Sequence, residues 1–416
     1  MRKRLSSFNP ALATTAVLLL LAATAPLSAQ EWARFRGPNG TGISSATTIP
    51  TSWKDDTYNW KLNLPGEGHS SPVLWGSKLF LTATQPGTAE QIFFCVNADS
   101  GKVVWQKRFA SRPHRQHKFN SFASSSPAAD ENHVYFYWAT PQQQTILALD
   151  HDGKEIWRKN LGPFESQHGS GTSPMIHGEL LILANDQMGS SFVIALDRMT
   201  GAVKWKTPRG GGGKKTAYGT PCVRKDAQGN DQLILASHAH GISAIDPATG
   251  KMLWDTPDIF DKRSVFCPVL AGDLILASCG SGGGARNYTV ALRANPKPTV
   301  AYRIDRSSPY VPTPIYYKKM LFLVSDGGIG TCLEAASGKV LWRERIGGDY
   351  FGSPVCVNGV IYCISRAGDV VTFHAKSTYE PIGRVSLGEM SHATPAVAGG
   401  RMYLRTKSHL YSLGGK

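Results

Sequence analysis

The sequence predicts an all-β fold, an eight-bladed β-propeller of four-stranded antiparallel blades, from two repeated patterns. The first is a hairpin in which a glycine precedes a tryptophan by four residues, as in SGKVLW at residues 337–342. It recurs as SGKVVW, DGKEIW, TGAVKW and TGKMLW. The second is a Ser/Thr/Cys-Pro step followed by apolar residues, at Pro72, Pro127, Pro174, Pro221, Pro268, Pro314, Pro354 and Pro395. The spacing of these prolines, 40 to 55 residues, matches the period of propeller blades.

Each repeat unit contains four strand-like segments in a constant order. The proline step begins the first segment, and a turn with glycine or asparagine leads to a second one such as LFLTA at residues 79–83. A third segment such as FVIALD at residues 192–197 leads through the glycine turn to the tryptophan segment. Asn97, Asp197 and Asp246 precede the turn glycine by four residues, where a side-chain oxygen can cap the turn. Short strands separated by frequent turns predict antiparallel sheets throughout.

The last unit lacks its fourth segment, and the start of the chain supplies it. The sequence ends at a segment equivalent to the third strand of the other units. Trp60 precedes Pro72 by 12 residues, the same distance at which Trp342 precedes Pro354. We therefore expect the strand around Trp60 to complete the eighth blade, which removes the open sheet edges between first and last blades.

The repeated tryptophans are predicted to be structural, each wedged against the neighbouring blade. Burial of a large aromatic ring explains their spacing without a ligand. The fifth unit carries Tyr302 at this position, and the seventh has no aromatic residue there. The predicted blade tryptophans are Trp60, Trp105, Trp157, Trp205, Trp254 and Trp342.

The first 29 residues read as a secretory signal peptide. A basic start precedes an uncharged, mostly apolar stretch at residues 11–23, and Ser28-Ala29 offers a cleavage site. We expect an N-terminal extension at residues 30–57 and the propeller at residues 58–416. The first cysteine is Cys95, so a lipid anchor at the cleavage site is not expected, and no segment is long enough to span a membrane. These features predict a monomeric periplasmic or secreted protein.

The chain is basic, with a formal net charge of +15, and this favours anionic partners. Export argues against nucleic acid, which leaves acidic protein surfaces, lipid head groups or envelope polymers. Residues 101–129 contain no acidic side chain and could form a docking face, although a solvated loop is the simpler interpretation. The candidate docking residues are Lys107, Arg108, Arg112, Arg115 and Lys118. The seven cysteines show no spacing that predicts disulfides or a metal site.

The repeated Ser-Pro start, the ALD-x-x-TG-K-x-x-W ending and the eight-fold count resemble the pyrroloquinoline-quinone-like (PQQ-like) β-propeller family. WARFRGPNGTG at residues 32–42 and SDGGIGTCLEAASGK at residues 325–339 resemble secreted members of it. The resemblance covers nearly the whole predicted mature chain. It implies the fold more specifically than the function, because the family includes both quinoprotein alcohol dehydrogenases and the propeller subunit of the outer-membrane barrel-assembly machinery.

Residues just before the proline steps are expected to cluster at one mouth of the central channel. Closure of the ring would bring His69 and His392 together with Glu67 and Glu389, which could bind a metal ion or perform acid–base chemistry. A hydrated polar lining would need the same residues, so we assign no catalytic or metal-binding residue. The candidate binding residues are His69, His392, Glu67, Glu389, Asp349, Tyr218, Phe351, His168 and Arg263.

Two classes of function remain open from the sequence. The first is a non-catalytic binding or scaffolding module in the cell envelope, with a protein or anionic polymer as its partner and no cofactor. The second is a quinoprotein oxidoreductase with PQQ and Ca²⁺. The resemblance implies that such enzymes carry an adjacent cysteine pair against the quinone, and this sequence has none. We therefore favour the first class.

Overall fold

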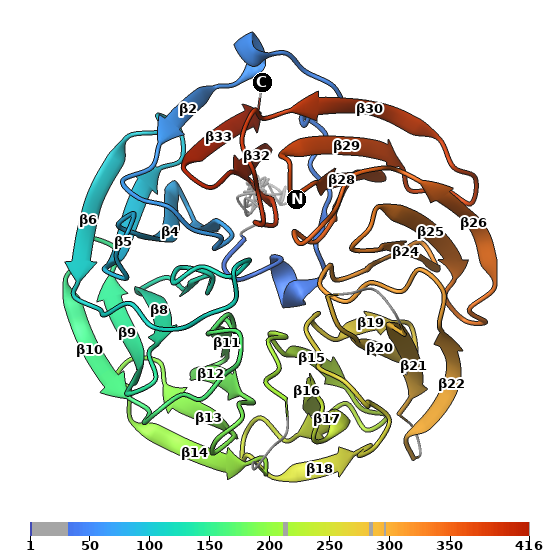
Figure 1. Ribbon diagram of the computed structural model, residues 1–416, viewed down its shortest axis with the longest axis horizontal. Helices are drawn as coiled ribbons and strands as arrows, with labels where there is room; N and C mark the ends of the chain where they lie inside the picture. The colour runs from blue at the N-terminus through green and yellow to red at the C-terminus, as the bar shows by residue number, and fades with distance from the viewer. Residues whose placement is uncertain (2–31, 211–214, 283–285, 295–296, 416) are drawn as a thin grey trace.

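The computed structural model describes Met1 and residues 32–210, 215–282, 286–294 and 297–415. The predicted signal peptide, apart from Met1, lies outside the described residues. Eight antiparallel sheets stand around a central axis like the blades of a propeller, and Figure 1 shows them in chain order around the ring. The predicted all-β, eight-bladed architecture is confirmed. Among the described residues, no helix has the length and apolar character needed to cross a membrane.

The blades follow one another along the chain, and each runs from an inner to an outer strand. Blade 1 contains β3 (Val73–Trp75), β4 (Lys78–Thr84), β5 (Gln91–Asn97) and β6 (Val103–Phe109). Blade 2 contains β7 (Ala128–Ala129), β8 (His133–Ala139), β9 (Gln144–Asp150) and β10 (Glu155–Asn160). Blade 3 contains β11 (Met175–His177), β12 (Leu180–Asn185), β13 (Phe192–Asp197) and β14 (Val203–Pro208). Blade 4 contains β15 (Cys222–Lys225), β16 (Asp231–Ser237), β17 (Gly241–Ile245) and β18 (Met252–Asp255).

The second half of the ring repeats this order. Blade 5 contains β19 (Val269–Ala271), β20 (Leu274–Cys279), β21 (Tyr288–Arg293) and β22 (Thr299–Ile304). Blade 6 contains β23 (Ile315–Tyr317), β24 (Met320–Val324), β25 (Ile329–Glu334) and β26 (Val340–Arg345). Blade 7 contains β27 (Val355–Val357), β28 (Val360–Ile364), β29 (Asp369–His374) and β30 (Pro381–Ser386). Blade 8 contains β31 (Ala396–Ala398), β32 (Arg401–Arg405), β33 (His409–Gly414) and β2 (Trp60–Asn63).

The ring is closed as predicted, because β2 pairs with β33 antiparallel, from Trp60 opposite Ser412 to Asn63 opposite His409. A second connection joins the same two blades at the axis, where the Thr394 backbone N–H donates to Ser71 Oγ over 3.0 Å. Both connections link residues more than 300 positions apart in sequence. The first and last blades are therefore held together at the rim and at the centre.

The residues before the prolines are joined around the channel by hydrogen bonds, which explains the small polar residue in the repeated step. The Ser71 N–H donates to Ser126 Oγ and the Ser126 N–H to Ser173 Oγ. The series resumes at Thr220 of blade 4. Beyond blade 4 it passes through the Cys267 thiol and Thr313. Each donor is a backbone N–H of one blade and each acceptor a side chain of the next.

The tryptophan of one blade and the glycine turn of the next are in contact at the rim in five places. The Trp205 indole N–H donates to the Pro247 carbonyl in the turn of blade 4, over 2.9 Å. Gly250 lies in that turn with a φ of +76°, and a Cβ there would lie 2.6 Å from the Trp205 ring. Equivalent indole bonds reach the next blade from Trp60, Trp105, Trp157 and Trp342. The glycine is therefore needed twice, for the left-handed turn and for the room it leaves to the neighbouring ring.

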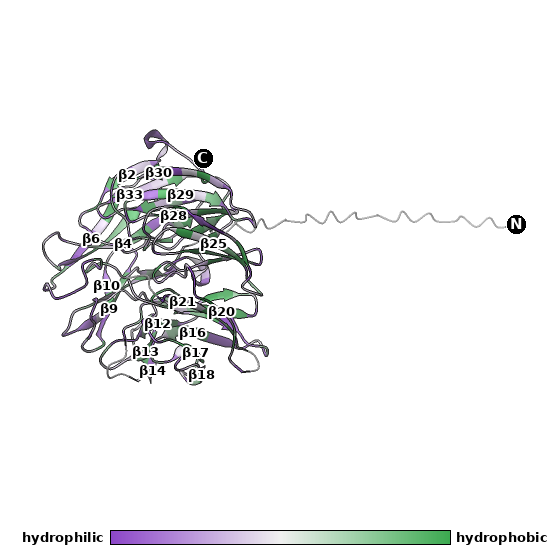
Figure 2. Ribbon diagram, turned by 45° about the vertical axis from the view of Figure 1, so that its right-hand side comes forward, coloured by the Kyte–Doolittle hydropathy of each residue, from purple (hydrophilic) through white to green (hydrophobic). Residues whose placement is uncertain are grey.

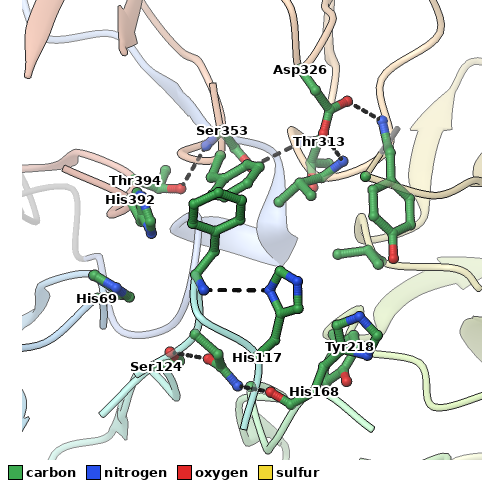
Figure 3. A pocket seen from close by; sticks show the side chains of 18 of the residues that line it. His69, His117, Ser124, His168, Tyr218, Thr313, Asp326, Ser353, His392 and Thr394 are labelled. Atoms are coloured by element: carbon green, nitrogen blue, oxygen red, sulfur yellow. Dashed lines mark hydrogen bonds between the residues drawn. The ribbon is translucent and has the colours of Figure 1, made fainter. Parts of the chain in front are cut away.

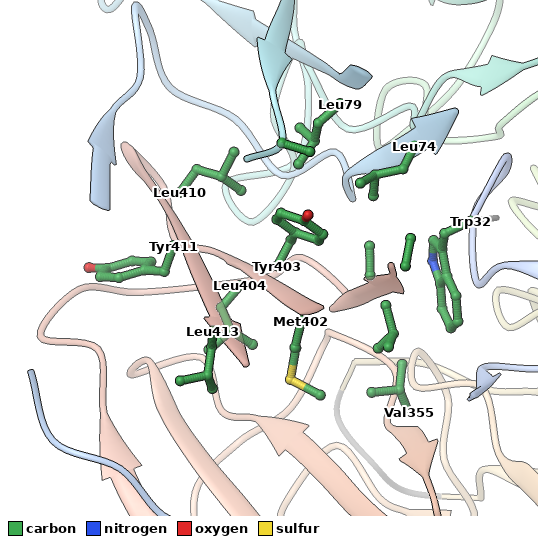
Figure 4. Close-up of a cluster of buried hydrophobic side chains, with 14 of the residues drawn as sticks. Trp32, Leu74, Leu79, Val355, Met402, Tyr403, Leu404, Leu410, Tyr411 and Leu413 are labelled. Carbon is green, nitrogen blue, oxygen red and sulfur yellow. The ribbon is translucent and has the colours of Figure 1, made fainter. Parts of the chain in front are cut away.

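Apolar side chains fill the spaces between blades. Figure 4 shows the cluster where blades 8, 1 and 7 meet, with Leu74 and Val355 near the indole of Trp32 and Met402 farther from it. Strands in the middle of a blade, such as β20, are hydrophobic in Figure 2, whereas β6 at the rim is largely exposed. All seven cysteines are buried and free. Their thiols serve as small apolar side chains in this core.

An N-terminal segment, residues 32–44, crosses the central channel. The backbone of Trp32 and Ala33 bonds to the inner strands of blades 1 and 2, and Arg34 donates to the Pro221 carbonyl of blade 4 over 2.7 Å. Arg36 donates to the carbonyls at the start of blades 6 and 7. The segment contains the short 3₁₀ turn η1 (Pro38–Gly40) in the middle of the ring in Figure 1, and its strand β1 (Ile43–Ser44) pairs parallel with β27. A second turn, η2 (Asp55–Thr57), precedes β2. The segment thus closes one end of the channel.

Candidate functional site

A cavity of about 870 Å³ lies in the channel, between the N-terminal segment and the opposite mouth. Phe35 of the N-terminal segment lines it, together with residues that precede the inner strands of the blades. Its volume lies in the range of small-molecule binding sites. Because the N-terminal segment closes the channel behind Phe35, the cavity is open toward one face of the propeller.

Most of the sequence-predicted binding residues line this cavity. They come from separate blades and converge because each sits in the loop that enters the inner strand of its blade. Figure 3 shows His69, His392, His168 and Tyr218 around the same space. The predicted residues that line the cavity are His69, His168, Tyr218, Arg263, Asp349, Phe351 and His392.

Glu67 and Glu389, the other two predicted residues, do not line the cavity in the described structure. Glu67 forms an ion pair with Lys407 at 2.7 Å. The Glu389 carboxylate accepts hydrogen bonds from Ser408 and pairs with His409 at 3.0 Å. These bonds lower the pKa of Glu389 to about 2 against the opposing effect of burial, which is the largest single influence. The two carboxylates are occupied by neighbouring loop residues instead of joining the imidazoles.

Four imidazoles stand in two pairs on the cavity wall. The ring centroids of His69 and His392 lie 4.3 Å apart, and those of His117 and His168 lie 4.8 Å apart. Burial, followed by the charge of Arg366, lowers the pKa of His392 to about 4. Burial and the charge of Arg263 lower the pKa of His168 to about 4 as well. These two imidazoles are therefore neutral at pH 7.

Arg405 lies in β32, beside the His69–His392 pair, and is fully buried. Burial, followed by the neighbouring His392 and Arg405, holds the pKa of His69 well below its usual value. Arg405 donates to the Ser70 backbone carbonyl over 2.8 Å. Protonating either imidazole would place a further positive charge beside an existing one, so this wall of the cavity offers neutral hydrogen-bonding groups.

Arg263 is the most deeply placed cation of the cavity lining, with 7% of its surface exposed. Its guanidinium makes two long hydrogen bonds, to the Tyr310 hydroxyl at 3.4 Å and to Gln167 Oε1 at 3.2 Å. Its Nε has no hydrogen-bond partner, and no carboxylate of the described residues pairs with it within 4 Å. A buried guanidinium without a counter-charge is unfavourable, which makes Arg263 the strongest anion-binding group of the cavity.

Arg366 is held differently, between two aromatic rings at the mouth. Its guanidinium carbon lies 4.1 Å from the Phe119 ring centre and 4.7 Å from that of Phe351. Asp349, which is exposed, pairs with it at 3.7 Å. This cation is thus partly neutralised within the protein.

Sequence reasoning missed several lining residues, among them Phe119, His117, Asp326 and Arg366. Phe119 and His117 lie in the long connection between β6 and β7, whose charge alone stood out in the sequence. Asp326 follows β24, and its carboxylate accepts the Tyr310 and Val311 backbone N–H groups. Burial raises the pKa of Asp326 to about 6. The absence of an acidic residue between two strands, with aromatic residues interspersed, was the available signal for the connection.

The five candidate docking residues do not share one environment. Lys107 and Arg108 are on the exposed rim strand β6, where Arg108 pairs with Glu90 at 2.7 Å. Arg112 and Arg115 are exposed in the connection to blade 2. Lys118 lies over the Phe119 ring, 5.0 Å from its centre, close to the cavity mouth. The stretch therefore runs from the rim to the mouth.

The donor set of the cavity does not suit a metal ion. In the described parts of the chain, no group of three or more His, Cys, Asp or Glu side chains is placed to hold one. Ca²⁺ requires six to eight oxygen ligands. Of the two lining carboxylates, Asp349 faces Arg366 and Asp326 is bonded to backbone N–H groups. The carboxylates that line the cavity thus do not form the oxygen cluster that Ca²⁺ requires.

Comparisons with known proteins identify the kind of propeller. A profile of the family described as outer membrane protein assembly factor BamB matches residues 51–282 and 242–413. Tetrathionate hydrolase of Acidithiobacillus ferrooxidans is 26% identical over 315 residues, 73% of this chain and 50% of that protein. BamB of Yersinia pestis is 26% identical over 227 residues, 50% of this chain and 54% of that protein. The chain thus spans about half the length of these curated relatives.

Solved structures of the same fold include BamB from Moraxella catarrhalis, with a TM-score of 0.63, 16% identity, and coverage of 86% of this chain and 96% of that one. A quinohemoprotein alcohol dehydrogenase from Comamonas testosteroni has a TM-score of 0.66 at 14% identity, covering 93% and 80%. At such identities the likeness shows the shared fold alone, because one fold carries many functions.

Proposed function

The chain belongs to the PQQ-like β-propeller family whose profile is described as BamB, and from this we propose that it is an exported, non-catalytic binding and scaffolding module of the cell envelope. Its binding site would be the channel-mouth cavity. A protein or an anionic polymer of the envelope would be the partner. The two BamB relatives support this class of function.

One observation carries the proposal: the cavity joins an uncompensated buried cation to neutral imidazoles and aromatic rings, without a cluster of free carboxylates among the described lining residues. Such a lining can bind an anionic group of a ligand, and its aromatic rings can stack on the part of the ligand next to that group. Its two carboxylates are held apart, Asp326 by backbone N–H groups and Asp349 by Arg366, and they form no cluster in the described lining. Binding is therefore better supported than turnover.

The alternative is a PQQ-dependent oxidoreductase, and an enzymatic assay separates the two. Purified protein incubated with PQQ and Ca²⁺ is expected to show no alcohol-dependent dye reduction above a protein-free control. Substrate-dependent reduction that disappears in the Asp326→Asn variant would overturn the scaffold proposal. Asp273→Asn, an exposed carboxylate outside the cavity in blade 5, is the matched control.

A binding experiment tests the positive side of the proposal. Cosedimentation with isolated cell envelopes is expected for the native protein and is expected to weaken for Phe351→Ala at the mouth. Charge reversal of Arg112, Arg115 and Lys118 tests the basic connection, since binding through these groups would fall steeply with salt. Equal cosedimentation by all variants at all salt concentrations would place the binding surface elsewhere.

A further inference from the structure

The closed end of the cavity limits what kind of ligand can enter. Residues 32–44 cross the channel and are bonded to several inner strands, and Phe35 lines the cavity from that side. A polymer cannot thread through such a channel. A ligand must enter from the open mouth, so the cavity suits a small molecule or the terminal unit of a chain.

The charge of the lining limits the ligand to a single buried negative group. Among the described residues that line the cavity, the cations are Arg263 and Arg366. Arg366 is sandwiched between Phe119 and Phe351 and faces Asp349. Arg263 has no carboxylate partner among the described residues, and its guanidinium makes two long hydrogen bonds to neutral groups. A tricarboxylate such as PQQ would bring more negative charge than this lining can neutralise.

The remaining wall is suited to hydroxyl groups and to the face of a ring. The neutral imidazoles of His168 and His392 can each donate and accept a hydrogen bond, as a hydroxyl can. Tyr218 adds a hydroxyl that contacts Ser166 at 3.1 Å. Phe351 stands edge-on to His392, with ring centres 4.9 Å apart, and provides an apolar surface beside these groups. A compact ring with several hydroxyls and one carboxylate matches this arrangement.

We propose that the cavity binds the terminal uronic acid unit of an acidic glycan, with its carboxylate on Arg263 and its sugar ring against the imidazole and aromatic wall. This inference rests on the proposed binding function and names its ligand class. The mouth connection at residues 110–127, with Lys118 beside Phe119, lies where the rest of an acidic chain would emerge. The site thus recognises a chain end, and the exposed basic residues contact the adjoining sugar units.

The test uses two sugars that differ in a single group, methyl β-D-glucuronide and methyl β-D-glucoside. Ligand-observed NMR titrations of the full protein are expected to show glucuronide binding at least tenfold tighter than glucoside. Arg263→Gln is expected to weaken glucuronide binding at least tenfold and to leave glucoside binding unchanged. Arg293→Gln, an exposed arginine of the same blade paired with Asp273, is the matched control and should bind as the native protein does.

A second variant and two further ligands keep the result interpretable. Phe351→Ala retains Arg263 and is expected to weaken the binding of both sugars. This variant separates the contribution of the ring contact from that of the charge. Equal binding of the two sugars, or no binding of either, would overturn the inference. If inorganic sulfate bound as tightly as glucuronide, the cavity would be an anion site only, and the inference would be overturned. Binding of PQQ that is tighter than that of glucuronide and depends on Arg263 would also overturn the inference. Envelope cosedimentation and the absence of dye reduction are independent of these titrations, so the proposed function can stand where the glycan inference fails.

Discussion

Two buried arginines, Arg209 between blades and Arg263 at the channel mouth, differ in the partners that the protein supplies to their guanidinium groups. Arg209 is fully buried where blades 3 and 4 meet, and its Nε pairs with Asp186 at 2.9 Å. Its two Nη atoms donate to Ser243 and Ser237 at 3.0 and 3.1 Å. Arg263 is almost as buried, yet it has no carboxylate partner among the described residues and an unbonded Nε. The fold thus supplies partners to every guanidinium nitrogen of Arg209 and leaves Arg263 without a counter-charge among the described residues.

The contacts between blades and the channel mouth differ in the same way, in whether buried polar groups have partners. Between blades, the tryptophan of one blade and the turn of the next complete each other's contacts, as Trp205 and Gly250 do. At the mouth, His392 has neither ring nitrogen bonded, and His69 and His168 each leave Nδ1 without a partner. Buried polar groups without partners cost stability. Unpartnered buried polar groups also occur elsewhere in the described structure, but those of the three histidines line the cavity.

Removal of the closing strand has the largest expected effect, because it breaks the scaffold that supports both regions. Deletion of residues 58–64 removes β2 and exposes the edge of β33. Exposed edges of this kind promote aggregation. We expect the truncated chain to be insoluble or to unfold, as measured by size-exclusion chromatography and thermal denaturation. A monomer with an unchanged melting temperature would contradict the closure of the ring through β2.

Trp205→Ala tests the rim contact directly. The ring is 8% exposed, fills the space beside Gly250 and donates to the Pro247 carbonyl. Replacing a buried tryptophan by alanine costs about 3–5 kcal/mol of the free energy of unfolding. Chemical denaturation should show a loss of this size. Val104→Ala, at an exposed position in β6, should change the unfolding free energy little and serves as the control.

Arg209→Met sharpens the comparison of the two arginines. The variant leaves Asp186 buried without its partner, and breaking a buried pair in this way costs about 3–5 kcal/mol. Urea denaturation should therefore show a strongly lowered midpoint. Restoring neutrality with the double variant Arg209→Met, Asp186→Asn should recover part of the loss. An Arg209→Met midpoint equal to that of the native protein would show that the pair contributes nothing to stability.

The lowered pKa values of the histidines at the mouth predict that the protein loses stability in mild acid. The pKa values of His168 and His392 are lowered to about 4, so between about pH 6.5 and 4 the unfolded chain binds protons that the folded chain does not. Stability is present above pH 6.5 and is lost as the pH falls toward 4. Asp326, with its pKa raised to about 6, acts in the opposite direction, because its stabilising proton is lost as the pH rises through 6.

Single-residue variants separate the contribution of these histidines to the pH dependence of stability from the contribution of carboxylates. His392→Gln should make the decline of the melting temperature between pH 6.5 and 4.5 shallower. Asp326→Asn should make it steeper, since it removes the opposing group. His177→Gln, a partly exposed histidine paired with Asp231, is the control. Identical slopes for the native protein and His392→Gln would contradict the neutral state of that imidazole.

The rim was predictable from sequence because its contacts repeat. Glycine and tryptophan stand at a fixed spacing in five of the eight units, and the Trp60-to-Pro72 spacing revealed the closure. The polar step before each proline was visible too, but its ring of hydrogen bonds was not, since each bond joins two units 40 or more residues apart.

The mouth was predictable only in part. Position before a proline step placed His69, His392 and Arg263 correctly in the cavity lining. The sequence position could not show that Glu67 forms an ion pair with Lys407, because this pairing depends on the direction of the side chain within a loop. Phe119 and Arg366 come from non-repeated connections, and only the fold shows that they meet.

The unfolding midpoint of Arg263→Met tests the central claim, that the mouth holds this cation for a ligand at no benefit to the fold. Methionine preserves the apolar length of the side chain and removes a buried charge that has no carboxylate partner among the described residues. Replacing an uncompensated buried charge in this way is expected to be neutral or stabilising. We predict a midpoint equal to or above that of the native protein, in contrast to Arg209→Met. A fall as large as that of Arg209→Met would show that Arg263 is a structural residue and would contradict the account.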